Sequence, residues 1–398
     1  MVTQITPGVY WVGVVDWGLR QFHGHELSTH RGSSYNSYLI VDEKVVLVDT
    51  VLTSFQDQLI ENIREVIDPA RIDYVIANHA EVDHSGGLPA IMRLAPNATL
   101  VVSQRGRQSV EGYYHQPWNF KTVKTGDRLN IGKNELIFIE APMLHWPDSM
   151  FTYLTGKNLL ISNDSFGQHY ATAFRFNDQV DQTELYDEAL KYYANILNPF
   201  STQVSRKISE VLALGLPIDV IAPSHGVIWN QDPAQIIKKY QEWSAQKPEK
   251  SAVIIYDTIW DGTRHMAESI GQGMADEGLQ YKMFHAGVAD RNDIIAEVFK
   301  AKAVVIGSCT FNQGVLPTLT PVLEDLRGLK FQNKIGAAFG SYGWSGEGVA
   351  ILEEHLNRCK IKVMVPGIKL KWQPMEAELA QCRDFGKKIA AAVNEEVV

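Results

Sequence analysis

The sequence predicts an α/β protein built from two successive domains. Its 398 residues are more than one ordinary domain uses. Up to residue 245, predicted hairpins and helices are mixed, which favours two sheets packed between helices. After a polar segment at residues 246–251 that contains Pro248, strands and helices alternate regularly. That alternation predicts a parallel doubly wound sheet. We therefore place the domains at residues 1–249 and 250–398.

Hydrophobic periodicity locates the elements of the first domain. Two antiparallel hairpins are expected, one over residues 37–48 and one over residues 150–161. Strands are expected at residues 9–14, 37–41, 44–48, 74–77, 99–102, 135–139, 150–154, 158–161 and 218–222. Helices are expected at residues 55–67, 183–196, 204–214 and 233–245. This order suits an αββα sandwich.

The second domain has a simpler pattern. Five apolar strands are expected, with crossover helices between them and a last helix at residues 376–393. The strands are expected at residues 252–256, 280–284, 303–306, 334–339 and 362–365. Five such strands predict a flavodoxin-like sheet, which binds its ligand at the carboxyl ends of the strands.

Composition excludes several classes of protein. The net charge of −9 argues against a general nucleic-acid binder. The three cysteines form no Cys-x-x-Cys pair, which favours a reducing compartment. The amino-terminal residues lack a signal peptide, and no apolar run approaches the length of a membrane span. We therefore expect a cytoplasmic protein without nucleic-acid or membrane partners.

The densest chemical signal follows the strand at residues 74–77. His79, Glu81, Asp83 and His84 fall within six positions. Their spacing resembles the His-x-His-x-Asp-His motif of the metallo-β-lactamase superfamily, with Glu81 in place of the second histidine. A carboxylate makes the site harder and more anionic, which suits iron or manganese better than zinc. The exchange favours redox chemistry over hydrolysis.

Three later residues also follow apolar strands in the first domain. They are His145, Asp164 and His225. Taken singly, each is more often a solvated or capping residue than a ligand. Lactamase-superfamily proteins place a third histidine, a bridging aspartate and a last histidine in this order.

The resemblance therefore implies a dinuclear site. His79, Glu81 and His145 are assigned to one metal. Asp83 and His225 are assigned to the other, with Asp164 as the bridge. Two roles are open for His84: a ligand of the second metal, or an outer residue that orients a ligand or water. His169 and Asp148 are expected to lie around the ligands.

Three loops at strand ends in the second domain predict an FMN site. Hydroxyls and a glycine at a helix start suit a terminal phosphate, and aromatic side chains can stack on a planar ring. Ordinary helix caps also use threonine and glycine, so the first loop alone is a weak signal. The residues expected to bind FMN are Thr258, Ile259, Trp260, Asp261, Gly262, Thr263, Ser308, Thr310, Phe311, Asn312, Gly340, Ser341, Tyr342, Gly343 and Trp344. Cys309, without a nearby histidine base, is expected to pack.

Together these motifs resemble the flavodiiron proteins over essentially the whole chain. The matching segments are His-Ala-Glu-Val-Asp-His, His-Trp-Pro-Asp-Ser-Met, Ser-Asn-Asp-x-Phe-Gly-Gln-His, Ser-His-Gly-Val and Phe-Gly-Ser-Tyr-Gly-Trp-Ser-Gly-Glu. The chain is most similar to the core of the anaerobic nitric oxide reductase flavorubredoxins, including the segment at residues 31–38, and is also similar to rubredoxin:oxygen oxidoreductases. Flavorubredoxins carry a rubredoxin with two cysteine pairs after this core, and this sequence has none.

The resemblance implies reduction of nitric oxide to nitrous oxide, of dioxygen to water, or of both. Two iron ions would act, fed by FMN. We expect a separate electron donor, such as rubredoxin or its reductase. The resemblance also implies a head-to-tail homodimer, and a tetramer is left open.

Two other classes of function remain at this stage. One is a zinc metallohydrolase fused to a flavodoxin domain, against which Glu81 speaks. The other is a flavin electron carrier with an inert lactamase-like domain, against which the complete ligand set speaks. The ligands do not separate nitric oxide from dioxygen. Four outer residues are candidates for that preference: His25, His30, Tyr192 and Tyr193.

Overall fold

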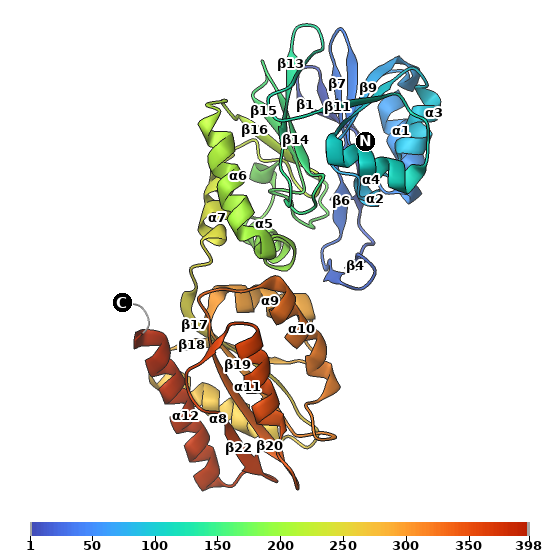
Figure 1. The fold of residues 1–398 in the computed structure, drawn as a ribbon. Helices are drawn as coiled ribbons and strands as arrows, with labels where there is room; N and C mark the ends of the chain where they lie inside the picture. Colours follow the sequence, from blue (N-terminus) through green and yellow to red (C-terminus); the bar gives the residue numbers. More distant parts are fainter. Residues whose placement is uncertain (1, 396–398) are drawn as a thin grey trace. The chain divides into compact units, whose positions relative to one another are not determined.

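The computed structural model describes residues 2–395. The expected outer limits at residues 1 and 398 lie outside the described residues. The chain divides into two compact units, one of Met1–Tyr192 with Phe200–Ser244, the other of Tyr193–Pro199 with Ala245–Val398 (Figure 1). The short segment Tyr193–Pro199 belongs to the second unit although it interrupts the first, which no sequence pattern indicated. Within the described residues, no helix is long and apolar enough to cross a bilayer.

The first unit contains two large sheets. The seven-stranded sheet has the order β1-β2-β7-β8-β9-β10-β11. Its strands are β1 (Thr3–Thr6), β2 (Val9–Trp11), β7 (Tyr38–Val41), β8 (Val45–Val48), β9 (Ile72–Ala77), β10 (Thr99–Ser103) and β11 (Phe120–Val123). The five-stranded sheet runs in chain order through β12 (Arg128–Asn130), β13 (Glu135–Glu140), β14 (Met150–Leu154), β15 (Leu159–Asn163) and β16 (Val220–Pro223). Two small hairpins pair β3 (Val14–Asp16) with β6 (Ser33–Tyr35) and β4 (Gln21–Phe22) with β5 (Leu27–Ser28).

Helices cover the outer faces of the two sheets (Figure 1). The helices of this unit are α1 (Gln56–Arg64), α2 (Val82–Ser85), α3 (Leu88–Leu94), α4 (Gln104–Tyr114), α5 (Gln182–Tyr192), α6 (Ser201–Ala213) and α7 (Ala234–Ser244). The inner faces share one core, in which Ile40 and Val48 of the larger sheet join Phe138 and Leu154 of the smaller. The predicted αββα sandwich is therefore confirmed.

Two of the predicted elements of the first unit are interrupted or end early, and the helices α3 and α4 and the strands β1, β11 and β12 were not predicted. The strand expected at residues 9–14 is broken at Gly13, where a Cβ atom would lie 2.2 Å from the carbonyl oxygen of Tyr35. The helix expected at residues 183–196 ends at Tyr192, and a π-helical turn (Tyr193–Leu197) continues into the second unit. In both places a close tertiary contact or a change of packing partner overrides the local pattern.

The second unit is a parallel sheet in the order β18-β17-β19-β20-β21, with β22 also pairing with β20. The strands are β17 (Glu249–Asp257), β18 (Gln280–His285), β19 (Ala301–Ser308), β20 (Ile335–Tyr342), β21 (Lys362–Val363) and β22 (Ile368–Lys371). The helices are α8 (Gly262–Asp276), α9 (Arg291–Lys300), α10 (Thr320–Leu329), α11 (Gly348–Arg358) and α12 (Glu376–Glu395). This strand order is that of flavodoxins. The doubly wound sheet is confirmed, with β22 as a sixth strand that the sequence did not predict.

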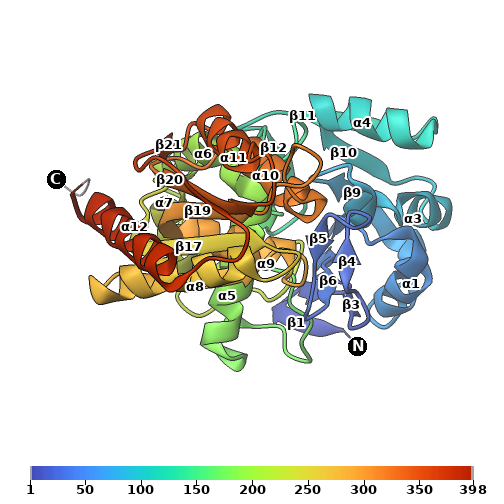
Figure 2. The same ribbon diagram turned by 90° about the horizontal axis from the view of Figure 1, so that it is seen from below.

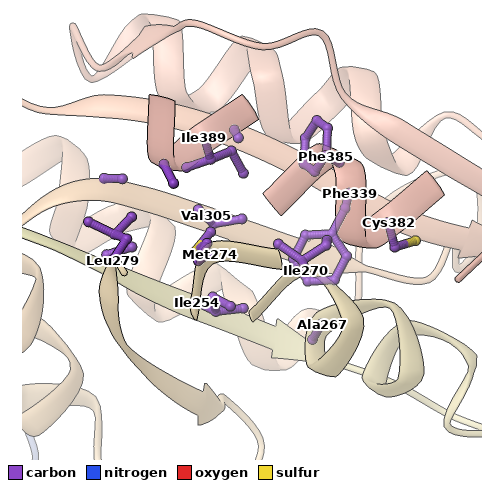
Figure 3. Close-up of a cluster of buried hydrophobic side chains, with 14 of the residues drawn as sticks. Ile254, Ala267, Ile270, Met274, Leu279, Val305, Phe339, Cys382, Phe385 and Ile389 are labelled. Carbon is purple, nitrogen blue, oxygen red and sulfur yellow. The ribbon is translucent and has the colours of Figure 1, made fainter. Parts of the chain in front are cut away.

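Alternating side chains along β17 supply both cores of this sheet. Ile254 packs on the face covered by α8 and α12, whereas Val253 and Ile255 pack on the opposite face. Figure 2 shows α8 and α12 running side by side. In Figure 3, Met274 of α8 and Phe385 of α12 close over the sheet. Burial of such a side chain contributes about 1.5–3 kcal/mol, so the sheet is a firm base for the loops at its strand ends.

Candidate metal centre and flavin loops

The loop after β9 is held in place by hydrogen bonds to its first residue, Asn78. Asp49, at the end of β8, is buried and accepts hydrogen bonds from the backbone N–H of Asn78 at 2.7 Å and from its side chain at 3.3 Å. Burial raises the pKa of Asp49 to about 6. The chain then forms the single helical turn α2, which carries Asp83 and His84. A short rigid turn between a strand and a helix holds its side chains in fixed directions.

One group of metal-binding side chains consists of His79, Glu81 and His145. The Nε2 atom of His79 lies 3.2 Å from Glu81 Oε2, and the Nε2 atom of His145 lies 3.6 Å from the same oxygen. The three ligand atoms lie within 4.8 Å of one another, close enough to hold one metal ion. On the outer side, His79 Nδ1 donates to Asp148 Oδ1 at 3.1 Å, which leaves Nε2 for the metal.

A second group consists of Asp83, His84 and His225, all buried. Asp83 Oδ2 lies 3.2 Å from His84 Nε2 and 3.1 Å from His225 Nε2. His225 Nδ1 donates to the carbonyl oxygen of Ser34 at 2.7 Å. This hydrogen bond assigns the tautomer, because a carbonyl can only accept, and it leaves the Nε2 lone pair facing Asp83.

Asp164 lies between the two groups. Its Oδ2 atom is 3.4 Å from His145 Nε2 and 3.9 Å from His79 Nε2. Its Oδ1 atom is 3.0 Å from His84 Nε2 and 3.5 Å from His225 Nε2. Each oxygen of one carboxylate therefore faces a different group, which is the arrangement a carboxylate bridge requires.

Several of these buried atoms lack hydrogen bonds. Within residues 2–395, none is found for either oxygen of Asp83, either ring nitrogen of His84, or Asp164 Oδ2. Asp83 Oδ2 and His84 Nε2 lie 3.2 Å apart, and Asp164 Oδ2 lies 3.4 Å from His145 Nε2, without forming a hydrogen bond. Leaving such groups unpaired costs roughly 1–3 kcal/mol each, and more for charged ones. Metal ions would remove that cost, and a donor set of imidazoles and carboxylates suits iron. The residues present thus fit a pair of iron ions.

The carboxylates of the site are held in their ionised form. Burial by itself would raise the pKa of Asp164, but the facing His84 and His145 hold it well below its usual value. Burial also opposes ionisation of Glu81, whose pKa is nevertheless lowered by His23 and His79. The carboxylates are therefore anionic, as ligands of a divalent cation must be.

The flavin loops follow three neighbouring strand ends in the second unit. Residues 258–261 join β17 to α8, and Gly262 and Thr263 begin that helix. The Thr263 hydroxyl is hydrogen bonded to that of Ser341 at 2.9 Å, so the first and third loops meet here. The free N–H groups of a helix start and nearby hydroxyls can hold a phosphate.

A cavity of ≈ 360 Å³ lies between the second and third loops. Its lining includes the expected residues Thr310, Asn312, Gly343 and Trp344. Trp344 is 86% exposed and Trp260 is 81% exposed. Apolar rings left in water are available to cover a planar ligand. The loops therefore fit a flavin.

Two expected flavin residues have structural partners as well. The Ser308 hydroxyl donates to the Cys309 carbonyl and accepts from the Leu316 N–H. At Gly340, a Cβ atom would lie 2.1 Å from the Ser308 carbonyl oxygen. This glycine therefore permits close approach of β19 and β20, a role that the expectation of a ligand contact did not include. Cys309 is buried, as expected of a packing residue.

Comparison with known proteins gives the family. Residues 34–226 match the family described as ODP family beta lactamase, and residues 254–386 match Flavodoxin. A nitric oxide reductase of Moorella thermoacetica is 49% identical over 98% of both chains. An anaerobic nitric oxide reductase flavorubredoxin of Escherichia coli is 47% identical over 97% of this chain and 81% of its own length.

Solved structures agree. The flavodiiron protein of Giardia intestinalis is 35% identical, covers 100% of this chain and 98% of its own, and superposes with a TM-score of 0.94. This chain belongs to the flavodiiron protein family. The rubredoxin oxygen:oxidoreductase of Desulfovibrio gigas is 37% identical with a TM-score of 0.98 over 100% of both chains. The predicted oxidoreductase class is confirmed, as are the predicted cofactors, a non-haem di-iron site and FMN.

The outer residues of this flavodiiron site were only partly anticipated. Tyr192 donates to Asp164 Oδ1 at 3.2 Å. Tyr193 instead packs on Phe299 in the second unit, and His25 and His30 are exposed. No sequence pattern indicated His23, whose Nε2 lies 2.9 Å from Glu81 Oε1. His23 sits in the turn between β4 and β5 at a φ of 51°, where no periodic pattern could have marked it.

The second unit also holds residues that the sequence reasoning missed. β22 ends at Lys371. The next residue, Trp372, donates its backbone N–H to the Tyr342 carbonyl at 2.8 Å. The Trp372 ring is 63% exposed and lies against Gly343, where a Cβ atom would be 2.9 Å from it. Prediction of β22 would have placed this indole beside the third loop.

Proposed function

We propose that this protein reduces two molecules of nitric oxide to nitrous oxide and water, with two electrons and two protons. Reduction of dioxygen to water, with four electrons and four protons, belongs to the same proposal. The observation that carries it is Asp164, whose two oxygens face separate groups of ligands. Two irons held by these groups would bring two small molecules together, and proximity of this kind lowers the entropic barrier to their joining.

In this proposal the ligands divide as the distances do. His79, Glu81 and His145 would hold one iron. Asp83, His84 and His225 would hold the other, and Asp164 would join the two groups. His84 is included as a ligand because neither of its ring nitrogens makes a hydrogen bond in the part of the chain that the structure describes. Bound ferrous iron would supply electrons and Lewis acidity.

Two residues are suited to hold protons at the site. The Tyr192 hydroxyl points at Asp164, and the His23 imidazole lies against Glu81. Burial alone lowers the pKa of His23, but the neighbouring Glu81 carboxylate outweighs it, so the net pKa is raised. Both reductions consume protons, and these two groups could deliver them at the edge of the ligand set.

The flavin loops would hold FMN with its phosphate at the start of α8 and its ring beside Trp344. FMN accepts electrons singly or in pairs, so it can pass them on one at a time. The donor would be a separate protein such as rubredoxin or its reductase. The chain's own cysteines do not form such a centre, because Cys359 and Cys382 pack on opposite faces of the flavodoxin sheet.

We further propose a cytoplasmic head-to-tail homodimer, in which the flavin of one chain serves the irons of its partner, with a tetramer as a higher assembly. Each unit is tens of ångströms across by the usual size scaling, which favours a path between chains. Light scattering would give the assembly size. If dilution dissociates the dimer, each chain loses its partner's flavin, so turnover per chain should fall while the iron and FMN contents stay constant. Constant turnover by monomers would contradict the dimer.

Dioxygen is the second candidate substrate. The structural similarity to a protein named rubredoxin oxygen:oxidoreductase, with a TM-score of 0.98, favours it. The identity of 49% to a protein named nitric oxide reductase favours nitric oxide.

Amperometric consumption of each gas under one saturating artificial reductant tests the proposal. Faster loss of nitric oxide than of dioxygen, abolished in a metal-stripped sample, is the expected result. The reverse preference would make the protein a dioxygen reductase. Metal-dependent loss of neither gas would overturn the redox assignment and leave the zinc hydrolase and the flavin carrier.

A further inference from the structure

An apolar cavity lies in the first unit, between the five-stranded sheet and the helices α6 and α7. It leaves ≈ 20 Å³ for the centre of a water-sized molecule, more than the roughly 10–15 Å³ that one such molecule needs. Phe151 and Leu160 line it from β14 and β15. Val204 and Ile208 line it from α6, four residues apart on one face of that helix.

The lining runs from a half-exposed leucine to two residues that neighbour proposed ligands in the chain. Lys207 and Leu212 form its outer end, and Leu212 is 50% exposed. At the inner end are Leu144, which precedes His145, and Ser165, which follows Asp164. The cavity thus borders the chain positions next to two of the proposed ligands.

The chemistry of the lining disfavours water. The accessible lining is almost entirely apolar, and Ser165 contributes a buried hydroxyl with no hydrogen-bond partner in the chain over residues 2–395. A buried water usually needs two to four polar partners, and one hydroxyl is too few. Small neutral gases have the opposite requirement, since they lose little on leaving water and gain contacts with apolar walls.

We propose that this cavity is a docking site for a diatomic gas, nitric oxide or dioxygen, on its way to the metal centre. The gas would enter beside Leu212, rest between Phe151 and Val204, and leave past Ser165. This inference rests on the proposed function, because the cavity has a role in catalysis only if the substrate is a gas. It assigns the gas a route separate from the polar side of the site, where His23 meets Glu81.

Xenon under pressure tests the site without turnover. Crystals of the wild-type protein should show xenon between Phe151, Val204 and Ile208. The Val204→Phe variant should exclude it by filling the space. Absence of xenon from this cavity in the wild type would overturn the proposal.

Gas kinetics then test the route. In Val204→Phe we expect the KM for the gas to rise about tenfold, with kcat at saturating gas and the iron and FMN contents unchanged, since only access is altered. Val101→Phe is the matched control, because Val101 is equally buried in β10 but does not line the cavity. An unchanged KM in a variant that excludes xenon would overturn the route.

A second variant covers the case in which Val204→Phe does not fold, since overpacking a core is destabilising. Leu212→Trp narrows the exposed mouth, where there is room to adjust, and should raise the KM without loss of stability. The proposed function is tested separately. If the wild-type protein consumes neither gas, the proposed function is wrong, whether or not xenon binds in the cavity.

Discussion

The metal centre and the flavin loops solve the problem of binding in opposite ways. The metal centre is built mostly from buried side chains, with His79 at 0% and Asp164 at 1% exposure, and only Glu81 and His145 partly exposed. Its outer atoms are hydrogen bonded, and several of its inner atoms are left unpaired. The flavin loops are built from backbone and from rings in solvent, with Trp344 at 86%. A small cation needs a few ligand atoms at fixed positions, whereas a large planar cofactor needs an extended surface against which its ring can pack.

The sharpest way to break this comparison is Asp164→Asn. An amide offers one neutral oxygen in place of two anionic ones, so the bridge is lost. We expect the affinity for the pair of irons to fall by more than about 100-fold, with FMN retained. Iron and FMN per chain, measured after desalting, give the result.

Asp219→Asn makes the same chemical change at an exposed position and serves as the control. It should retain both irons. An Asp164→Asn protein that also retained two irons would show that the carboxylate is not a bridge.

Glu81→His sharpens the metal side of the comparison. Replacing a carboxylate with an imidazole makes the first ligand group softer and less anionic, which favours zinc over iron. We expect iron retention to fall by about 10-fold or more, on the scale known for changes around metal ligands, and redox turnover to fall with it. Metal analysis after growth with both metals checks this. Wild-type iron content and turnover would contradict the argument from ligand hardness.

Trp344→Ala tests the flavin side. Its ring is exposed, so its loss should change stability by no more than about 0.5 kcal/mol. Loss of stacking should weaken FMN binding about tenfold, which corresponds to about 1.4 kcal/mol. Fluorescence titration of the flavin-free protein measures this, with Trp17→Ala, another exposed tryptophan in the first unit, as the control. Equal FMN affinity in the two variants would remove Trp344 from the site.

The smallest effect concerns the sheet beneath the flavin loops. Burial, with Lys302 nearby, lowers the pKa of Lys334 to about 7, although its Nζ donates to the carbonyls of Phe299 and Ala301. Between about pH 7 and pH 10.5 the unfolded chain holds a proton here that the folded chain has lost, so stability rises with pH, by at most about 1.4 kcal/mol per unit.

Hydrogen exchange of the β20 amides as a function of pH, corrected for the intrinsic exchange rate, measures that slope. The Lys334→Met variant should lose the part of the pH dependence of stability that comes from Lys334, whatever the substitution does to the absolute stability. The same slope in both proteins would mean that Lys334 keeps its proton in the fold.

The two sites also differ in how much of them the sequence could predict. The grouping of the candidate metal ligands was predictable because their chemistry resides in residue type and each follows an apolar strand, as Asp164 follows β15. The flavin loops were predictable only by position, at the ends of β17, β19 and β20. Which of their residues face a ligand depends on packing, as the partners of Ser308 show.

What the sequence could not predict depends on contacts between distant segments. His23 reaches Glu81 from 58 positions away (81 − 23) through an irregular turn. Trp372 follows a strand whose pattern, Ile-Lys-Leu-Lys, is too short and too polar to stand out. The π-helical turn at Tyr193 reflects a change of packing partner, which no local preference encodes.

Mössbauer spectroscopy of the protein loaded with ⁵⁷Fe tests the central claim most directly, since that claim is that one carboxylate joins two ligand groups. Two irons per chain that share a bridge should be magnetically coupled, and the diferric form should have a diamagnetic ground state. Two independent high-spin ferric sites, with magnetic splitting in an applied field, would contradict the bridge and the proposed function built on it.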